Sequence, residues 1–238
     1  MDMDILFISV FNLGCIEIAE NHIISLLRSG INNYRAYVTD QESFNILIKK
    51  GYNVEYYPVE QSREKMNFGT SGFNYLSYVR YKIINELLND GKIVWYLDVD
   101  TVVLYDLNRV VSYFIGKDIV MQHDINMPCT GCMLYYPTDV SQQMTNYIYQ
   151  LRTSSENDQI LFSELLYNNK CVKLQLLDYE IFVNGLLFFN ELSHNEYYRQ
   201  LQINFKKTEK PLYLVHANWM VGIETKIHEL KKKDLWYL

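Results

Sequence analysis

The sequence lacks several features that define whole classes of protein. It has only four cysteines in 238 residues, without the regular spacing of a disulfide framework, which favours a reducing compartment. Its single CxxC pair, Cys129 and Cys132, lies in a predicted strand, where packing is favoured over a zinc site. No apolar run approaches the roughly 20 residues that span a bilayer, and the opening MDMDILFISV is acidic where a secretory signal would be basic. We therefore expect a cytoplasmic protein with no transmembrane segment.

Excess positive charge and linker-like stretches are also missing. The chain has 22 lysines and arginines against 28 aspartates and glutamates, and this net charge of −6 argues against a nucleic-acid partner. With 10 glycines, 4 prolines and no internal repeat, no stretch looks like an interdomain linker. A chain of this length can bury a large core without disulfides or structural metals. The prediction is a single domain over residues 1–238.

What is present is an alternation of short apolar runs and helical periodicity. Strands are predicted at 5–10, 34–40 and 53–59, separated by helices at 16–30 and 41–51. Such a β-α-β-α-β series predicts an α/β domain with a mostly parallel central sheet, flanked by helices.

The same alternation continues to the end of the chain. A glycine-containing loop at 68–75 leads into a long helix whose apolar stripe runs from Phe73 to Leu88, and a central strand follows at 92–97. The elements predicted beyond it are strands at 118–124 and 131–137, helices at 140–154 and 156–169, further apolar segments at 172–178, 184–189 and 212–219, and an exposed basic helix at 224–238.

Two aspartates, Asp98 and Asp100, follow the central strand at its carboxyl end. Ligands of open α/β sheets gather at this end of the strands. If the strand continued through both residues, their side chains would share one face, and a divalent cation would relieve the repulsion between them. The triplet alone also fits an ordinary turn at the end of a strand.

Arg80 interrupts the apolar stripe of the long helix. An unpaired charge is costly to bury, so a buried arginine at this position needs a carboxylate or a phosphate partner. The alternative is an arginine that extends from the edge of the helix into solvent.

Taken in order, these segments resemble the GT-A-fold glycosyltransferases of the nucleotide-diphospho-sugar transferase group. The segments that carry the resemblance are GFNYLSYVRYKIINELLNDGKIVWYLDVDTVVLYDL, CTGCMLYYPT, NDQILFSELL, FVNGLLFF and VHANWMVGIETK, all after residue 70. The first seventy residues match only in topology. The sequence departs from the group at Cys129, where relatives often have asparagine, and in a compact acceptor-side region that leaves the acceptor open. The resemblance implies one Rossmann-like GT-A domain, with a nucleotide-binding half at 1–107 and a donor-sugar and acceptor half at 108–238.

The resemblance also implies a metal site with a chemical purpose. When a sugar nucleotide reacts, charge develops on the departing diphosphate, and bound Mn²⁺ or Mg²⁺ stabilises that charge. Asp98, Asp100 and His216, which ends the apolar run LYLV, would be the ligands, and the imidazole favours Mn²⁺. Gly222 would let the backbone approach the diphosphate, and Lys226 would supply a positive charge. A solvated face of the last helix is the alternative for Lys226.

Asp158 and Gln159 are the candidate catalytic residues, because the resemblance places such a pair beside the donor sugar. The alternative is a helix N-cap at Asn157 or Asp158. Retention of the anomeric configuration is expected, because no second carboxylate stands out as an inverting base. The other expected contacts of the donor are Val10, Phe11, Asn12, Arg80, Val99, Thr130, Gly131 and Asn218, with Asn184 and Gly185 on the acceptor side.

The predicted function is metal-dependent transfer of a hexosyl or pentosyl group from a nucleotide-diphosphate sugar, with UDP favoured, to a glycan or glycoprotein. One alternative is a phosphatase of the haloacid-dehalogenase type, with Asp98 as nucleophile, Asp100 as acid and base, and Mg²⁺. Its motif would normally follow the first strand, whereas here three strands precede it. Another alternative is an inactive scaffold, against which the complete set of metal and diphosphate residues argues. The terminal KKKDLWYL suits either a peripheral membrane contact or a solubilising end.

Overall fold

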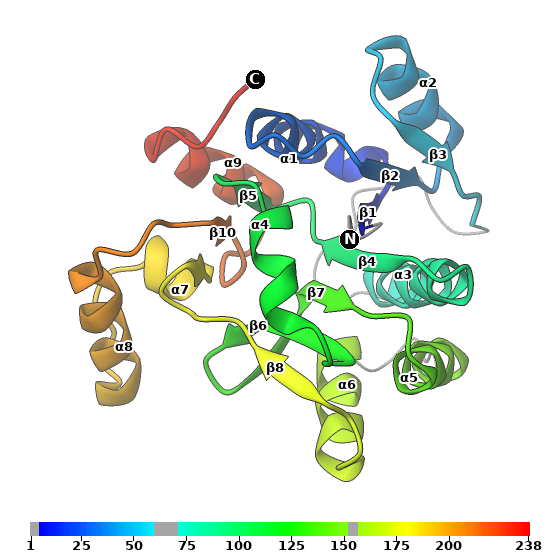
Figure 1. Ribbon diagram of the computed structural model, residues 1–238. Helices are drawn as coiled ribbons and strands as arrows, with labels where there is room; N and C mark the ends of the chain where they lie inside the picture. The colour runs from blue at the N-terminus through cyan, green and yellow to red at the C-terminus, as the bar shows by residue number, and fades with distance from the viewer. Residues whose placement is uncertain (1–4, 60–70, 152–156) are drawn as a thin grey trace.

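The computed structural model describes residues 5–59, 71–151 and 157–238, and a large twisted sheet forms its centre (Figure 1). The strand order is β3-β2-β1-β4-β7-β6-β8. These strands are β1 (Ile5–Phe11), β2 (Tyr34–Val38), β3 (Val54–Tyr56), β4 (Ile93–Leu97), β6 (Ile119–Asp124), β7 (Met127–Tyr135) and β8 (Leu174–Leu176). Neighbouring strands are parallel except at β7, which runs antiparallel to β4 and β6 because a two-residue turn joins it to β6. The predicted mostly parallel sheet is confirmed.

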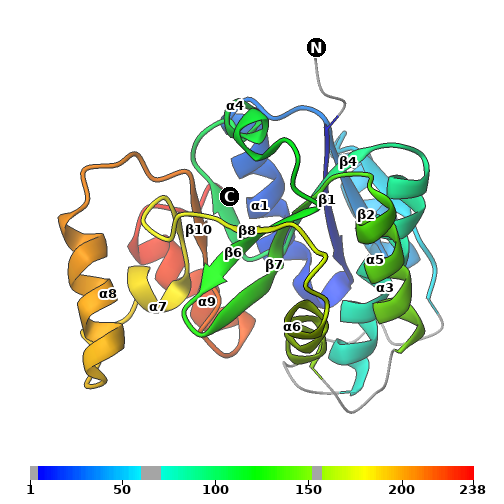
Figure 2. The same ribbon diagram turned by 60° about the horizontal axis from the view of Figure 1, so that its bottom comes forward.

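Both faces of this sheet are buried, because side chains along its central strands alternate between two apolar cores. In β4, Trp95 packs into one core and its neighbours Val94 and Tyr96 into the other. Figures 1 and 2 show the corresponding helices on opposite sides of the sheet. On one side lie α3 (Ser71–Asn89), α5 (Asp139–Gln150) and α6 (Asp158–Asn168), and on the other α1 (Ile16–Arg28), α2 (Gln41–Lys49) and α4 (Asn108–Val111). Short 3-10 turns precede α1 at Leu13–Cys15 and follow α4 at Ser112–Phe114.

A second, smaller sheet adjoins the carboxyl end of β4. It has the order β5-β10-β9, built from β5 (Thr101–Val103), β10 (Leu214–His216) and β9 (Phe182–Val183). The helices around it are α7 (Gly185–Phe188), α8 (Glu196–Lys207) and α9 (Ile223–Lys232), and α8 lies at the outer edge in both views (Figures 1 and 2). The chain passes from β4 to β5 through residues 98–100, so both aspartates lie where the two sheets meet.

The C-terminal segment differs from the prediction of an exposed helix to residue 238. Helix α9 ends at Lys232, and Leu230 and Leu235 are both buried in the core around the small sheet. Asn21 of α1 holds the tail, since its Nδ2 donates to the Leu235 carbonyl at 3.1 Å and its Oδ1 accepts from the Tyr237 amide at 2.6 Å. The apolar residues among the lysines therefore serve packing, which the basic composition of the segment concealed.

Three predicted segments are only partly described. Of the helix expected at 140–154, residues 152–154 lie outside the described ranges, and α5 ends at Gln150. The loop expected at 68–75 begins outside the described residues, and α3 is described from Ser71. The helix expected from residue 156 begins at Asp158, with residue 156 outside the described ranges. None of the helices within the described ranges is long and apolar enough to cross a membrane.

Candidate active site

The centre of the site is the turn that joins β4 to β5. If β4 continued through Asp98 and Asp100, their side chains would lie on one face of the strand. The strand ends at Leu97, so they do not share a strand face. The amide and hydroxyl of Thr101 both donate to the Asp98 carbonyl, at 3.1 and 2.8 Å, and close the turn instead. The antiparallel pairing of β5 with β10 sets Thr101 opposite His216, and so brings the imidazole to the aspartates.

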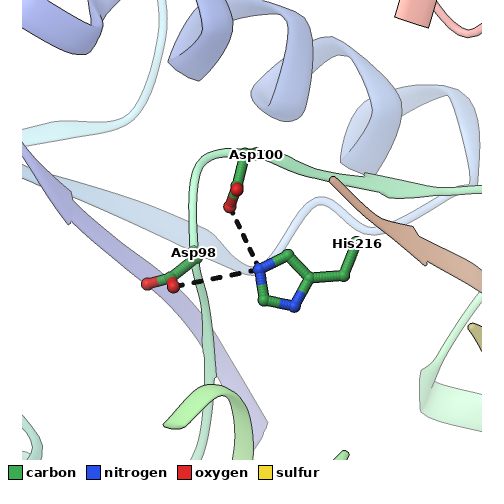
Figure 3. Close-up of side chains that lie close together, drawn as sticks. All are labelled: Asp98, Asp100 and His216. Carbon is green, nitrogen blue, oxygen red and sulfur yellow. Dashed lines mark hydrogen bonds and ion pairs between the residues drawn. The ribbon is translucent and has the colours of Figure 1, made fainter. Parts of the chain in front are cut away.

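These three side chains form a candidate metal centre. His216 Nε2 lies 3.2 Å from Asp100 Oδ1 and 3.9 Å from Asp98 Oδ2 (Figure 3), and the three ligand atoms all lie within 4.8 Å of one another. A side chain on Gly131 would overlap both Asp98 and His216, so only glycine leaves this space open. Two carboxylates and an imidazole are a donor set that suits a divalent cation such as Mn²⁺. The residues present therefore fit a divalent metal ion.

Asp100 is enclosed by positive charge. It is 8% exposed, and Lys226 Nζ lies 2.5 Å from its Oδ2, so Lys226 is not on a solvated face of α9. Burial raises the pKa of Asp100, but Lys226 and His216 more than offset that effect and hold it well below its usual range. Burial lowers the pKa of His216 and the charge of Asp100 raises it, with a net rise. Asp100 is thus an ionised carboxylate paired with the ammonium group of Lys226 and the imidazole of His216.

The opposite side of the imidazole is held by Gln122, a residue that the sequence reasoning missed. Its Oε1 lies 2.7 Å from His216 Nδ1, while its Nε2 donates to the Phe182 carbonyl at 3.2 Å, which sets the orientation of the amide. In the neutral ring the proton therefore sits on Nδ1, and the lone pair of Nε2 faces the aspartates. Cys129 Sγ packs 3.7 Å from the same Nδ1. The only signal for Gln122 was a glutamine inside an apolar predicted strand.

Arg80 is buried and meets carboxylates, as its position in the apolar stripe of α3 indicated. It is 5% exposed, which contradicts the alternative of an arginine extending into solvent. One Nη donates to Asp98 Oδ1 at 3.1 Å and the other pairs with Asp158 Oδ2. The hydroxyl of Tyr81 also donates to Asp158, at 2.7 Å. Arg80 thus joins the metal-centre aspartate to one of the two candidate catalytic residues.

The first turn of α6 separates the roles of its three polar residues. Asn157 is the N-cap, since its Oδ1 accepts from the Gln159 amide at 2.8 Å. The alternative that Asp158 caps the helix is wrong, because its carboxylate is bound to Arg80 and Tyr81. The Gln159 side chain donates to Asp124 Oδ2 at 3.2 Å.

Asp124, at the end of β6, is a second buried carboxylate that the sequence reasoning did not select. Its Oδ1 accepts from Trp219 Nε1 at 2.6 Å, Asn218 Nδ2 at 3.3 Å and Asn184 Nδ2 at 3.4 Å. Asp124 therefore binds Gln159 and Asn218, which are expected on the donor side, as well as Asn184, which is expected on the acceptor side. Its only signal was an aspartate at the end of a predicted strand.

The remaining predicted residues surround the same turn. The parallel pairing of Ile8 with Tyr96 sets the end of β1, residues 10–12, beside Asp98. The Asp98 amide donates to the Gly131 carbonyl at 2.7 Å, so Thr130 and Gly131 of β7 lie next to Asp98, and Val99 lies within the turn itself. Gly222 is the N-cap of α9 and has a φ of +88°, which favours glycine. The structure therefore brings Arg80, Gly131 and Lys226 into contact with the metal-centre residues at the junction of the two sheets.

Comparisons with known proteins agree with this geometry. The nucleotide-diphospho-sugar transferase family matches residues 29–230. A protein of Arabidopsis thaliana, UDP-D-xylose:L-fucose alpha-1,3-D-xylosyltransferase MGP4, is 28% identical over 214 residues, which cover 78% of this chain and 56% of that protein. The chain thus spans about half the length of the curated relatives it matches. The family match favours the glycosyltransferase interpretation over the phosphatase.

Solved structures give the same fold. The bifunctional glycosyltransferase WbbM has a TM-score of 0.61 and 15% identity, over 97% of this chain and 50% of that chain. The glycosyltransferase GlyE of Streptococcus pneumoniae TIGR4 has a TM-score of 0.59 and 16% identity, over 98% of this chain and 64% of that chain. At such identities the likeness establishes the fold alone, and it confirms the predicted GT-A architecture.

Proposed function

Because the chain belongs to the nucleotide-diphospho-sugar transferase family, we propose that it is an active, metal-dependent glycosyltransferase that uses a UDP-sugar. The observation that carries the proposal is the convergence of Asp98, Asp100 and His216 at the carboxyl end of β4, with Lys226 beside them. The named relative uses UDP-D-xylose and L-fucose, so UDP-xylose is the first donor to test and a saccharide the first class of acceptor.

Each charged residue has a part in holding the donor. A divalent cation held by Asp98, Asp100 and His216 supplies Lewis-acid stabilisation of the diphosphate charge. The first turn of α9 begins after Gly222, and its backbone amides together with Lys226 offer the diphosphate a positive environment. Arg80 keeps Asp98 paired and oriented from the side of α3. Gln159 lies beside the donor sugar and acts on the transition state.

We infer retention of the anomeric configuration. An inverting enzyme needs a carboxylate free to take the proton of the acceptor hydroxyl. Asp124 is the buried carboxylate to which the Gln159 side chain donates a hydrogen bond. Both of its oxygens already accept hydrogen bonds from N–H donors. NMR of the product formed from UDP-xylose, in which an α linkage is expected, tests this assignment.

Calorimetry tests the metal site most directly. We expect UDP to bind tightly with Mn²⁺ and much more weakly in EDTA, and Asp100→Asn to remove that difference and to abolish turnover. Asp90→Asn is the matched control, because Asp90 is exposed beyond the end of α3. Equal UDP affinity with Mn²⁺ and with EDTA would overturn the metal assignment.

A further inference from the structure

Two aromatic side chains meet next to Asp124, and one of them, Trp219, contacts it directly. Trp219, in the loop after β10, is 44% exposed, and Tyr198 of α8 meets it edge-on, with ring centroids 6.3 Å apart and planes at 70°. Asn126 Nδ2 donates to the Tyr198 hydroxyl at 2.7 Å and ties α8 to the turn after Asp124. We call Trp219 and Tyr198 the aromatic platform.

The backbone around this platform is strained. Trp219 has a φ of +62°, which is uncommon for a bulky side chain. Ile125, directly after Asp124, also has a φ of +62°, although a β-branched residue avoids this region. These are two of the three non-glycine residues with positive φ in the described part of the chain. Strain of this kind persists only where the surroundings impose it, and it gathers at functional sites.

Several contacts hold the strained loop in place. The indole N–H of Trp219 donates to Asp124, and the Ala217 amide donates to the Asp100 carbonyl at 2.9 Å. Asn218 is bound at both ends of its amide, since its Nδ2 donates to Asp124 and its Oδ1 accepts from the Gly185 amide at 2.7 Å. A side chain on Gly185 would overlap the Asn218 carbonyl, so α7 packs directly against this loop. Trp219 is therefore held rigidly while nearly half of the residue remains exposed.

We propose that the aromatic platform is the acceptor subsite and binds a neutral saccharide by stacking of a sugar ring on the Trp219 indole. This rests on the proposed function, because a saccharide acceptor presupposes glycosyl transfer. Asp124 bridges Trp219 and Gln159, so the platform lies one carboxylate away from the residue expected beside the donor sugar.

The charges at the platform favour a neutral ligand. Within the described part of the chain, its hydrogen bonds and ring contacts are with neutral side chains and with the carboxylate of Asp124, which would repel a phosphate or a nucleotide. The nucleotide is expected instead near Lys226 and α9, where the partners are cations. A sugar ring offers an apolar C–H face to the indole and hydroxyl groups to the surrounding amides, which matches both features of the platform.

The test separates acceptor binding from donor binding. Saturation-transfer NMR and acceptor kinetics are measured with methyl α-L-fucopyranoside, methyl β-D-galactopyranoside and methyl β-D-glucopyranoside, with UDP-xylose and Mn²⁺ for turnover. We expect Trp219→Ala to raise the acceptor KM about tenfold or more and to remove the NMR signal, while the Kd of UDP changes less than twofold. Trp219→Phe should restore part of the effect, and Tyr198→Ala should raise the acceptor KM about threefold. Tyr113→Ala is the control, because Tyr113 is 79% exposed and belongs to the 3-10 turn after α4.

Three results would overturn the subsite: an unchanged acceptor KM in both platform variants, an equal loss of UDP affinity and acceptor affinity, or binding of none of the three glycosides to the unaltered protein. Failure of the proposed function looks different. In that case UDP with Mn²⁺ does not bind the unaltered protein, whereas binding of a glycoside at Trp219 is still measured by NMR.

Discussion

Asp100 and Asp124 are two buried carboxylates of one site with opposite kinds of partners. They are 8% and 9% exposed. Asp100 is met by an ammonium group and an imidazole, with Lys226 Nζ at 2.5 Å and His216 Nε2 at 3.2 Å. Asp124 is met by neutral N–H donors from two asparagines, a glutamine and a tryptophan.

The different partners of Asp100 and Asp124 indicate different roles, one in binding charged ligands and the other in fixing the local structure. Lys226 is a point charge on a flexible stem, so Asp100 can exchange it for another cation without disturbing the surrounding backbone. The donors around Asp124 are themselves anchored, as Asn218 is to Gly185, and cannot move independently. Asp100 therefore belongs to the part of the site that handles the charged diphosphate, and Asp124 to the part that fixes geometry.

The largest effect is expected at the ion pair between Arg80 and Asp158, which links the two parts through α3 and α6. Asp158→Asn leaves a buried guanidinium with less compensation, and we expect the free energy of unfolding to fall by about 3–5 kcal/mol. Urea denaturation measures the loss. Asn157→Ala is the neighbouring control and should cost about 1 kcal/mol, the value of a helix cap. Similar losses in the two variants would contradict a structural ion pair.

The neutral imidazole of His22 holds Thr101, the residue after Asp100, and makes the stability of the protein depend on pH. His22 Nδ1 donates to the Thr101 carbonyl at 2.9 Å, and its Nε2 accepts from the Ser9 hydroxyl at 2.9 Å. Burial lowers the pKa of His22 from 6.5 to about 4, against the opposing effects of the Thr101 hydrogen bond and the charge of Asp100.

Between pH 6.5 and about 4 the unfolded chain binds more protons at His22 than the folded protein does. The stabilisation of the folded state by neutral His22 is therefore complete above pH 6.5 and is lost as the pH falls to about 4. The difference between the two pKa values corresponds to about 3 kcal/mol. Unfolding measured across this range should show a shallower pH dependence for His22→Gln than for the control His194→Gln, where the histidine is exposed. Identical slopes would show that His22 does not couple the turn to pH.

Replacing each of the two aspartates by asparagine tests whether Asp100 binds cations and Asp124 maintains the local structure. Asp124→Asn puts an amide N–H among N–H donors and leaves at least one of them unpaired, so we expect a loss of about 2 kcal/mol in stability. Asp100→Asn should cost less stability, because Lys226 is 21% exposed in its side chain and reaches water. Affinity for Mn²⁺ should fall only in Asp100→Asn. The reverse pattern would exchange the roles given to the two carboxylates.

The smallest effect is expected for Lys226→Ala. Loss of its charge should weaken UDP binding by about 1–2 kcal/mol. Without nucleotide the same variant should bind Mn²⁺ more tightly, because a competitor for Asp100 is gone. Lys232→Ala is the control on the same helix, since Lys232 is 63% exposed. Weaker Mn²⁺ binding in Lys226→Ala would show that Lys226 supports the metal site.

Part of this protein is readable in its sequence. The central strands of the large sheet are buried on both faces, so β1, β2 and β4 appear as apolar runs, and the helices between them carry a 3.6-residue period. Asp98 and Asp100 could be found because they follow such a run directly, and His216 because it ends another. Arg80 could be found because a charge interrupts an apolar stripe.

The tertiary structure alone decided the rest of the site. Asp124 meets Trp219 across 95 positions of the chain, and Gln122 meets His216 across 94. Contacts between residues so far apart leave no period or spacing in the sequence, and a lone aspartate or glutamine at a strand has no local signature. The positive φ of Trp219 is likewise imposed by partners from β6 and α7, since an isolated tryptophan avoids that conformation. Local sequence patterns therefore identified the charged residues of the site, whereas long-range packing determined the network of neutral side chains that holds them.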